Sequence, residues 1–395
     1  GGLAQLGRSS PASDQESRPD ALNQALIAAS CCNYAVMYRE TVAGASEAPC
    51  ASDCLSNSPQ LGFDTTAKFL GEQICADLED GLLSLGNQSR QRSLLLAERY
   101  GWDAEEGHRI WCFGPKDGCG LNAFLDFSSS PIEPEANIGV GAWPAVEAAC
   151  RWTVTEGALC EEPMRGIRFG LALRAARGRS ARVKDEDSEG KQSLAWPRAD
   201  TDEMATQQQT WRRRLAASAR QALLAAQVSP GAWPTLQEPM VQADFVLHAA
   251  DTSSLSSHVA ALREVLSERR GASLGLGWDE WDSLGDLDSL QPRWAPLRLT
   301  AELPALEAIG LETLLNGLLT DMSGGKTSAK QLRVQTTFAR WGTLPGRLGK
   351  DDPDSTYLQN TILAIRDWRQ LDARLPESAD FLGGAKLIDD DEEDF

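Results

Sequence analysis

The sequence has little histidine: only His108, His248 and His258 occur among 395 residues, and they lie far apart. Nine cysteines are present, but the closest metal-like spacing is Cys50-x-x-x-Cys54, and no second pair follows at a zinc-ribbon distance. No pattern of serine, histidine and aspartate resembles a catalytic triad. The sequence therefore predicts no metal site and no catalytic residues, and we expect free, mostly buried thiols in a reducing compartment.

Basic residues are also scarce. Lys and Arg number 38 against 57 Asp and Glu, which gives a net charge of −19. Because phosphate binding needs clustered Lys and Arg, this charge argues against a protein that coats DNA or RNA over much of its surface. It leaves room for one local basic patch. The acidic run Asp389–Asp394 is typical of a solvated end, and we expect residues 383–395 to form a disordered tail.

The sequence lacks an apolar run long enough to span a bilayer, and it lacks an opening signal-peptide pattern. We therefore expect a cytoplasmic protein with no membrane partner. Residues 1–33 are rich in Gly, Ser, Ala and Gln up to Asn23, and are expected to be a disordered leader or the remnant of a preceding domain. The start at Gly1-Gly2 rather than Met also leads us to expect a fragment or a trimmed product.

Hydrophobic periodicity predicts a mixed α+β chain. In the first part, residues 34–239, we expect strands at Ala35–Val42, Ile110–Phe113, Leu121–Phe127 and Ile167–Leu173, and helices at Gln91–Gly107, Ala142–Val154 and Met204–Ala226. A polar stretch, about 174–206, interrupts this part and is expected to be a long, partly disordered loop.

The second part, residues 240–350, has the clearest pattern. We expect strands at Val241–Leu247, Ala272–Leu276, Leu297–Leu303 and Leu332–Phe338, and helices at Ser253–Arg270 and Leu306–Leu319. The order strand-helix-strand-strand-helix-strand predicts a ferredoxin-like fold. A final helix, Leu358–Leu371, is expected within residues 351–382.

Two segments carry a resemblance to a known family. Arg109–Pro115 and Glu156–Phe169 resemble the fourth domain of elongation factor 2 and its relatives, GTPases that act on ribosomes. Tyr38–Val42, Leu96–Asp103 and Glu238–Met240 are similar in the same order, so the resemblance runs from about Tyr34 to Leu382. It implies a ribosomal-protein-S5-like domain IV, a ferredoxin-like domain V, and a monomer whose partner is rRNA of the large subunit or the 80S ribosome.

The chain departs from this family in its nucleotide site. The family's GTP-binding domain lies upstream of these segments, and no Gly-x-x-x-x-Gly-Lys-Ser/Thr motif occurs here. Gly325-Lys326-Thr327 lacks the first glycine, because Thr320 stands five residues before Gly325, and this segment fits a turn better. The resemblance therefore implies that GTP and Mg²⁺ belong to a missing domain. We expect this chain to hold no cofactor and not to hydrolyse GTP by itself.

The second departure lies at the tip of the fourth domain, where the family carries a histidine, modified to diphthamide, in a His-Arg-Gly-Gly-Gly loop. The matching region between Leu173 and Ser218 has an insertion, no histidine and no glycine triplet. This resembles the elongation-factor-like GTPase of 60S maturation, which releases an anti-association factor, more than the translocation factor. A spliceosomal U5 GTPase-like scaffold and a stand-alone protein-interaction module remain alternatives.

Two basic clusters flank this region, and the family's geometry implies that they lie near the tip that enters the ribosomal A site. The candidate rRNA contacts are Arg174, Arg177, Arg179, Arg182 and Lys184, followed by Trp211, Arg212, Arg213, Arg214 and Arg220. Arginine pairs with phosphate through two hydrogen bonds, and Trp211 is expected to stack on a base or a sugar. The alternative is a solvated loop followed by an exposed helix face.

Other conspicuous side chains are expected to be structural. The paired carboxylates Glu105-Glu106 and Glu161-Glu162 are predicted to be solvated or to cap helices, because no cleft is indicated around them. His108 is expected at the surface, and His258 is expected to be structural. The remaining tryptophans singled out by the patterns are expected to be core anchors: Trp111, Trp143, Trp152, Trp341 and Trp368.

Overall fold

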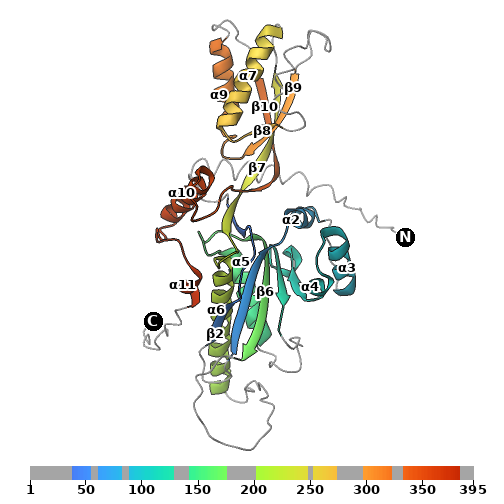
Figure 1. Cartoon of the computed structure of the whole chain (residues 1–395), viewed down its shortest axis with the longest axis vertical. Coiled ribbons are helices and arrows are strands. Elements are labelled where there is room, and N and C mark those ends of the chain that lie inside the picture. The colour runs from blue at the N-terminus through green and yellow to red at the C-terminus, as the bar shows by residue number, and fades with distance from the viewer. Residues whose placement is uncertain are drawn as a thin grey trace, which may run out of the picture. The chain divides into compact units, whose positions relative to one another are not determined.

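The computed structural model describes residues 38–54, 61–81, 89–128, 142–175, 202–247, 252–273, 297–322 and 332–382. The chain divides into two compact bodies (Figure 1). Among the described residues, the larger body contains those of Arg39–Leu236 and those from Leu344 to Leu382, and the smaller body contains those of Gln237–Thr343 together with Tyr38. The smaller body is thus inserted, in sequence, between two parts of the larger one.

The larger body is built on a five-stranded sheet with the order β2-β3-β6-β5-β4. Its strands are β2 (Cys50–Cys54), β3 (Leu61–Phe69), β4 (Ile110–Phe113), β5 (Leu121–Asp126) and β6 (Arg165–Ala175). Only the β5–β6 pair is parallel, and α5 (Ala142–Thr155) lies between those two strands in sequence. A parallel pair needs such a crossover connection, whereas the antiparallel pairs do not.

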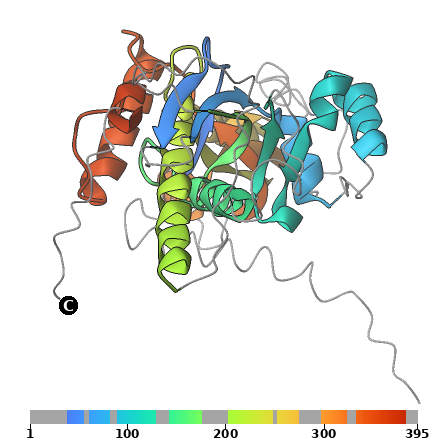
Figure 2. The same ribbon diagram turned by 90° about the horizontal axis from the view of Figure 1, so that it is seen from below.

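Helices α5 and α6 (Asp202–Gln227) pack side by side and share one core with the sheet (Figure 2). Within that core the rings of Phe124 and Phe169 stack with their centroids 5.2 Å apart. Side chains of alternate strand residues point to the other face of the sheet. There Leu125 shares a second core cluster with Ile74 of α2 (Glu72–Glu79) and Leu96 of α3 (Ser89–Tyr100).

Several predicted elements of this body differ from the structure. The single helix expected over Gln91–Gly107 is two helices, α3 and α4 (Ala104–His108), because Gly101 adopts a φ of 67° that ends the first. The predicted N-terminal strand is shorter, since β1 covers Arg39–Val42 and residues 35–37 lie outside the described part. Strands β2 and β3 and helix α2 were not predicted.

Helix α2 is held to the sheet by a buried arginine. The side chain of Arg165, which is 2% exposed, hydrogen-bonds Glu72 at 3.0 and 3.2 Å and Glu79 at 3.2 and 3.3 Å. The two carboxylates lie at opposite ends of α2, so one guanidinium fixes the helix along its whole length. Because the buried guanidinium is paired with two carboxylates, the fold avoids the free-energy cost of burying an unpaired charge.

After the smaller body, the chain returns to the larger body and forms α10 (Pro353–Trp368) and the short α11 (Ser378–Leu382). Asp352 begins α10 by accepting a hydrogen bond from the Ser355 N–H at 2.8 Å, and Pro353 stands at the first helical position. Helix α11 packs near α6 and β2. The predicted C-terminal helix therefore exists and belongs to the body that precedes the insertion.

The smaller body confirms the predicted order of elements. It consists of β7 (Pro234–Leu247), α7 (Thr252–Glu268), β8 (Ala272–Ser273), β9 (Leu297–Pro304), α9 (Leu311–Met322) and β10 (Leu332–Thr343). Its antiparallel sheet has the order β10-β7-β9-β8, which is the arrangement of a ferredoxin-like split βαβ fold. Both helices bury leucines against the sheet, and α9 starts at Leu311 rather than at the predicted Leu306 because turns occupy 305–310.

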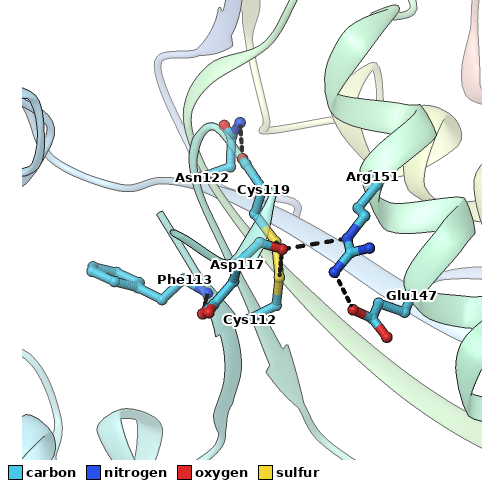
Figure 3. The surroundings of a disulfide bond; sticks show 7 residues. All are labelled: Cys112, Phe113, Asp117, Cys119, Asn122, Glu147 and Arg151. Carbon is cyan, nitrogen blue, oxygen red and sulfur yellow. Dashed lines mark hydrogen bonds and ion pairs between the residues drawn. A yellow bond between two sulfur atoms is a disulfide. The ribbon is translucent and has the colours of Figure 1, made fainter. Parts of the chain in front are cut away.

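The cysteines are not all free, which corrects the expectation from the sequence. Cys112 and Cys119 form a disulfide that closes the connection between β4 and β5 (Figure 3). In this loop the Asp117 carboxylate accepts a hydrogen bond from the Phe113 N–H at 2.8 Å, and the Asp117 carbonyl accepts one from Arg151 of α5 at 3.4 Å. Cys50, Cys75, Cys150 and Cys160 are buried free thiols, as predicted.

The helices of the described ranges include none with both the length and the apolar character that a membrane crossing requires.

Candidate nucleic-acid interface

Helix α6 presents three consecutive exposed arginines, Arg212, Arg213 and Arg214. Its opposite side is fixed in the core, where Leu215, Ala219 and Leu223 are fully buried at spacings of four residues. Two hydrogen bonds to the sheet reinforce this orientation, from the Thr65 hydroxyl to the Ala222 carbonyl at 2.6 Å and between the hydroxyls of Ser52 and Ser218 at 2.9 Å. Helical geometry therefore directs Arg213 and Arg214 to solvent. Arg212 falls on the same side of the helix as Leu215 and Ala219, although it is exposed.

The charges of Arg213 and Arg214 are available to a partner. In the part of the chain that the structure describes, neither Arg213 nor Arg214 pairs with a carboxylate. Ala216 and Ala217, one turn further along, are small and at least partly exposed, so they leave the helix backbone accessible. Guanidinium groups in this setting can each donate two hydrogen bonds to one phosphate.

The position of Trp211 does not fit its predicted stacking role. Its side chain is only 7% exposed and packs in the core shared by α6, α5 and the sheet. A ring in that position anchors the start of the basic segment and does not face solvent. We therefore remove Trp211 from the candidate rRNA contacts as a stacking residue.

The first predicted basic cluster cannot be placed. Arg174 lies in β6, where its backbone pairs with Gly62 of β3, and its side chain lies outside the part of the chain that the structure describes. Arg177, Arg179, Arg182 and Lys184 lie outside the described residues, as does most of the predicted loop over 174–206. Gly325, Lys326 and Thr327 are outside as well, so their predicted turn stays a prediction.

Arg220 contacts Trp152 and Glu156, and the sequence analysis did not predict this arrangement. Its guanidinium carbon lies 4.2 Å from the centre of the Trp152 ring of α5, and one of its nitrogens hydrogen-bonds the Glu156 carboxylate at 3.0 Å. The Trp152 indole N–H donates to the same carboxylate oxygen at 3.1 Å. These three side chains form one cluster at the surface between α5 and α6, which we call the Trp152 cluster.

The prediction that Trp152 and Trp368 are core anchors is wrong. Trp152 is 49% exposed and Trp368 is 47% exposed. A signal for Trp152 was present in the sequence, because the buried face of α5 contains Val146, Ala149 and Thr153. A residue at position 152 lies well off that face when 3.6 residues make a turn.

A buried carboxylate organises the loop that follows α5. Glu40 of β1 is fully buried and accepts hydrogen bonds from the backbone N–H groups of Leu159, Cys160 and Glu162 at 2.8, 2.7 and 3.0 Å, and from the Gln227 side chain at 2.7 Å. Burial raises the pKa of Glu40, and these hydrogen bonds oppose that rise. The resembling segment around Cys160 is thus a rigid loop tied to β1 and to the end of α6.

The paired carboxylates are partly corrected by the structure. Glu105 and Glu106 stand in the first turn of α4, as a capping role predicts, and Glu106 also pairs with Arg168 at 2.6 Å. Glu162 is not solvated, because its side chain is 2% exposed and is bound by Arg369 at the C-terminal end of α10. Burial raises the pKa of Glu162, and Arg369 opposes that rise.

No group of three or more His, Cys, Asp or Glu side chains that could hold a metal ion occurs within the described ranges. His258 is buried in α7. The described surface offers charge and aromatic rings for binding.

In a comparison with known families, residues 84–174 match the family model of elongation factor G, domain IV. The matched segment runs through α3, α4, β4, β5, α5 and most of β6, which carry both of the resembling segments of the sequence. A domain of this family is therefore present in the larger body. The match covers less than half of the chain, and α6 and the smaller body lie outside it.

Proposed function

We propose that this chain is the ribosome-docking C-terminal portion of a translation GTPase of the elongation factor 2 type. In this proposal the larger body corresponds to domain IV and the smaller, ferredoxin-like body to domain V. The observation that carries it is the match of residues 84–174 to elongation factor G domain IV, next to which α6 exposes Arg212, Arg213 and Arg214. The work of this portion is docking by shape and charge.

The proposed docking face is α6 and its contact with α5. The core packing of α6 fixes the helix backbone, so phosphate binding by Arg213 and Arg214 costs the freedom of their side chains alone. In the described chain this binding displaces no carboxylate from either arginine. The strongly negative net charge of −19 confines RNA contact to such a local patch, because phosphates are repelled elsewhere. GTP and Mg²⁺ are proposed to act in a domain that is not part of this sequence.

Co-sedimentation of the full chain with purified 80S and 60S particles, over a series of KCl concentrations, tests the proposal. We expect binding that weakens with salt and that Arg213→Glu reduces, with a smaller slope of log K against log [KCl] by about 1. Arg90→Glu on α3, an exposed arginine, is the matched control and should leave the slope unchanged. Particle binding that is insensitive to Arg213→Glu, or absent, contradicts the proposal.

A second candidate, within the same family, is maturation of the large subunit. It is favoured by the sequence between Leu173 and Ser218, which has no histidine and no glycine triplet. The same sedimentation series distinguishes the two. Preferential binding to free 60S particles supports maturation, and preferential binding to 80S ribosomes supports translocation.

A further inference from the structure

The Trp152 cluster has the form of half of a stacking site. Arg220 covers one face of the indole ring, and Glu156 holds both the guanidinium and the indole N–H. Trp152 as a whole residue is 49% exposed although Arg220 covers one face of its ring, so we assign much of this exposure to the other face and the ring edges. The ring is also fixed in orientation before any ligand arrives, so binding costs little side-chain freedom.

The charges around the cluster favour an anionic ligand with a flat aromatic group. Arg220 and Glu156 neutralise each other, and so do Arg151 and Glu147 on the same helix α5. The charges left around the cluster are the exposed carboxylate of Glu161, which acts on Arg220, and the exposed arginines of α6. A cationic peptide would be repelled by these arginines, and a plain acidic peptide would leave the ring unused.

The spacing along α6 suits a nucleic-acid strand. Arg213 precedes Arg220 by seven residues, which is close to two helical turns and places both on one face, about 10 Å apart along the axis. Ala216 and Ala217 lie between them and present no bulky side chain. A distance of this size is spanned by about two nucleotides of an extended strand, whose phosphates repeat at several ångströms.

We propose that Trp152, backed by Arg220, stacks against one unpaired RNA base whose neighbouring phosphates bind Arg213 and Arg214. This inference rests on the proposed function and names the ligand of the same surface: single-stranded RNA rather than a duplex. A base pair buried in a helix cannot present its face to Trp152, whereas an unpaired base can. Stacking of this kind tolerates any base, since each has an aromatic face.

Fluorescence anisotropy with the full chain and a fluorescein-labelled 12-nucleotide oligoadenylate tests the inference, with an RNA duplex of equal length as the second probe. Trp152→Leu should weaken binding to the single strand about 5- to 150-fold, the range for loss of one base–aromatic stack, and change duplex binding less than twofold. Trp152→Phe should retain most of the affinity. Trp368→Leu removes a tryptophan of nearly equal exposure on α10 and is the matched control.

The outcomes separate this inference from the proposed function. If the wild-type chain binds neither RNA nor ribosomal particles, the proposed function itself fails. If Arg213→Glu weakens RNA binding but Trp152→Leu does not, only the stacking site is overturned. If Trp152→Leu weakens binding to ribosomal particles while leaving oligoadenylate binding unchanged, the site takes a protein and the inference is overturned.

A probe that does not depend on the stability of the variants completes the test. The wild-type chain should bind an oligonucleotide of the same length that carries abasic sites at every position more weakly, by a factor similar to that of Trp152→Leu. Equal affinity for the two oligonucleotides shows that only phosphates are bound and overturns the stacking site.

Discussion

Arg369, the C-cap residue of α10, donates two hydrogen bonds to the carboxylate of Glu162, at 2.7 and 3.0 Å. Arg366, one turn earlier, donates to the Leu159 carbonyl of the same loop. The loop after α5 therefore contacts Glu40 of β1 and the C-terminal helix at the same time. This loop belongs to the segment that matches elongation factor G domain IV, so α10 contributes to the stability of that domain.

Removal of the Arg369 side chain measures how much the Arg369–Glu162 ion pair contributes to the free energy of unfolding. In Arg369→Ala the Glu162 carboxylate stays buried without its two guanidinium hydrogen bonds and keeps the electrostatic attraction of Arg39, and we expect the larger body to lose about 2–4 kcal/mol of unfolding free energy. Urea unfolding followed by tryptophan fluorescence measures the loss. The double variant Arg369→Ala with Glu162→Gln should recover a large part of it, and a double variant as unstable as the single one would show that the ion pair is not the cause.

Glu40→Gln tests the carboxylate at the centre of this loop. Each oxygen of Glu40 accepts two hydrogen bonds from N–H groups, so an amide nitrogen in place of either oxygen leaves two buried donors facing another donor. We expect a loss of about 2–4 kcal/mol in the free energy of unfolding. The exposed Glu98→Gln on α3 serves as the control with no expected change, and a Glu40 variant as stable as this control would contradict the role assigned to the carboxylate.

The hydroxyl of Tyr100 donates a hydrogen bond to the Asp77 carboxylate at 2.5 Å. Burial and this hydrogen bond raise the pKa of Tyr100 to about 12. Because the folded pKa exceeds that of the unfolded chain, the contribution to stability is complete below pH about 10 and is lost as the pH rises towards 12. Absorbance at 295 nm during alkaline titration should show a late step, and Tyr100→Phe should reduce its amplitude by that of one tyrosine. A titration in which this variant keeps the full amplitude of the late step would show that the step belongs to another residue.

Loss of the Cys112–Cys119 disulfide should destabilise the connection between β4 and β5. The bond closes a loop of sequence separation 7, and loop closure of this length is worth about 2 kcal/mol by chain entropy. Cys119→Ser should therefore unfold a few degrees earlier than the wild type under non-reducing conditions. Reducing agent should lower the wild type to the level of the variant and leave the variant unchanged. A wild type that is insensitive to reduction would indicate that the bond carries no stability.

The sequence predicted the elements whose pattern is local. In the smaller body, apolar residues alternate with polar ones along the strands and recur at helical spacing along the helices. Its βαββαβ order therefore followed from periodicity. Helix α6 was predicted within two residues at its start because strong helix formers fill Met204–Ala226. Packing between segments far apart in sequence was not visible in such patterns.

The missed elements illustrate this limit. Strand β3 contains Gly62, Asp64 and Lys68, which are poor strand residues, and it forms because β2 and β6 pair with it on both sides. Helix α2 has acidic residues at both ends whose partner, Arg165, lies 93 residues from Glu72. The disulfide was missed because proximity of Cys112 and Cys119 depends on the turn at 114–118.

The candidate site shows the same division. The exposure of Arg212, Arg213 and Arg214 agrees with the predicted helix face, whereas the burial of Trp211 depends on the depth at which α6 packs. In the Trp152 cluster, Arg220 meets Glu156, which lies 64 positions earlier in the sequence. Only the packing of α5 against α6 reveals this contact.

Site-directed photo-crosslinking tests the central claim most directly. A photoreactive amino acid at Ala217, an exposed position between Arg213 and Arg220 on α6, is irradiated in the full chain bound to 80S and 60S particles, with Glu98 of α3 as the comparison site. We predict crosslinks from position 217 to ribosomal RNA that exceed those from position 98 and that Arg213→Glu suppresses. Crosslinks from position 217 that are absent, that reach only protein, or that equal those from position 98 would contradict the docking of this face on RNA.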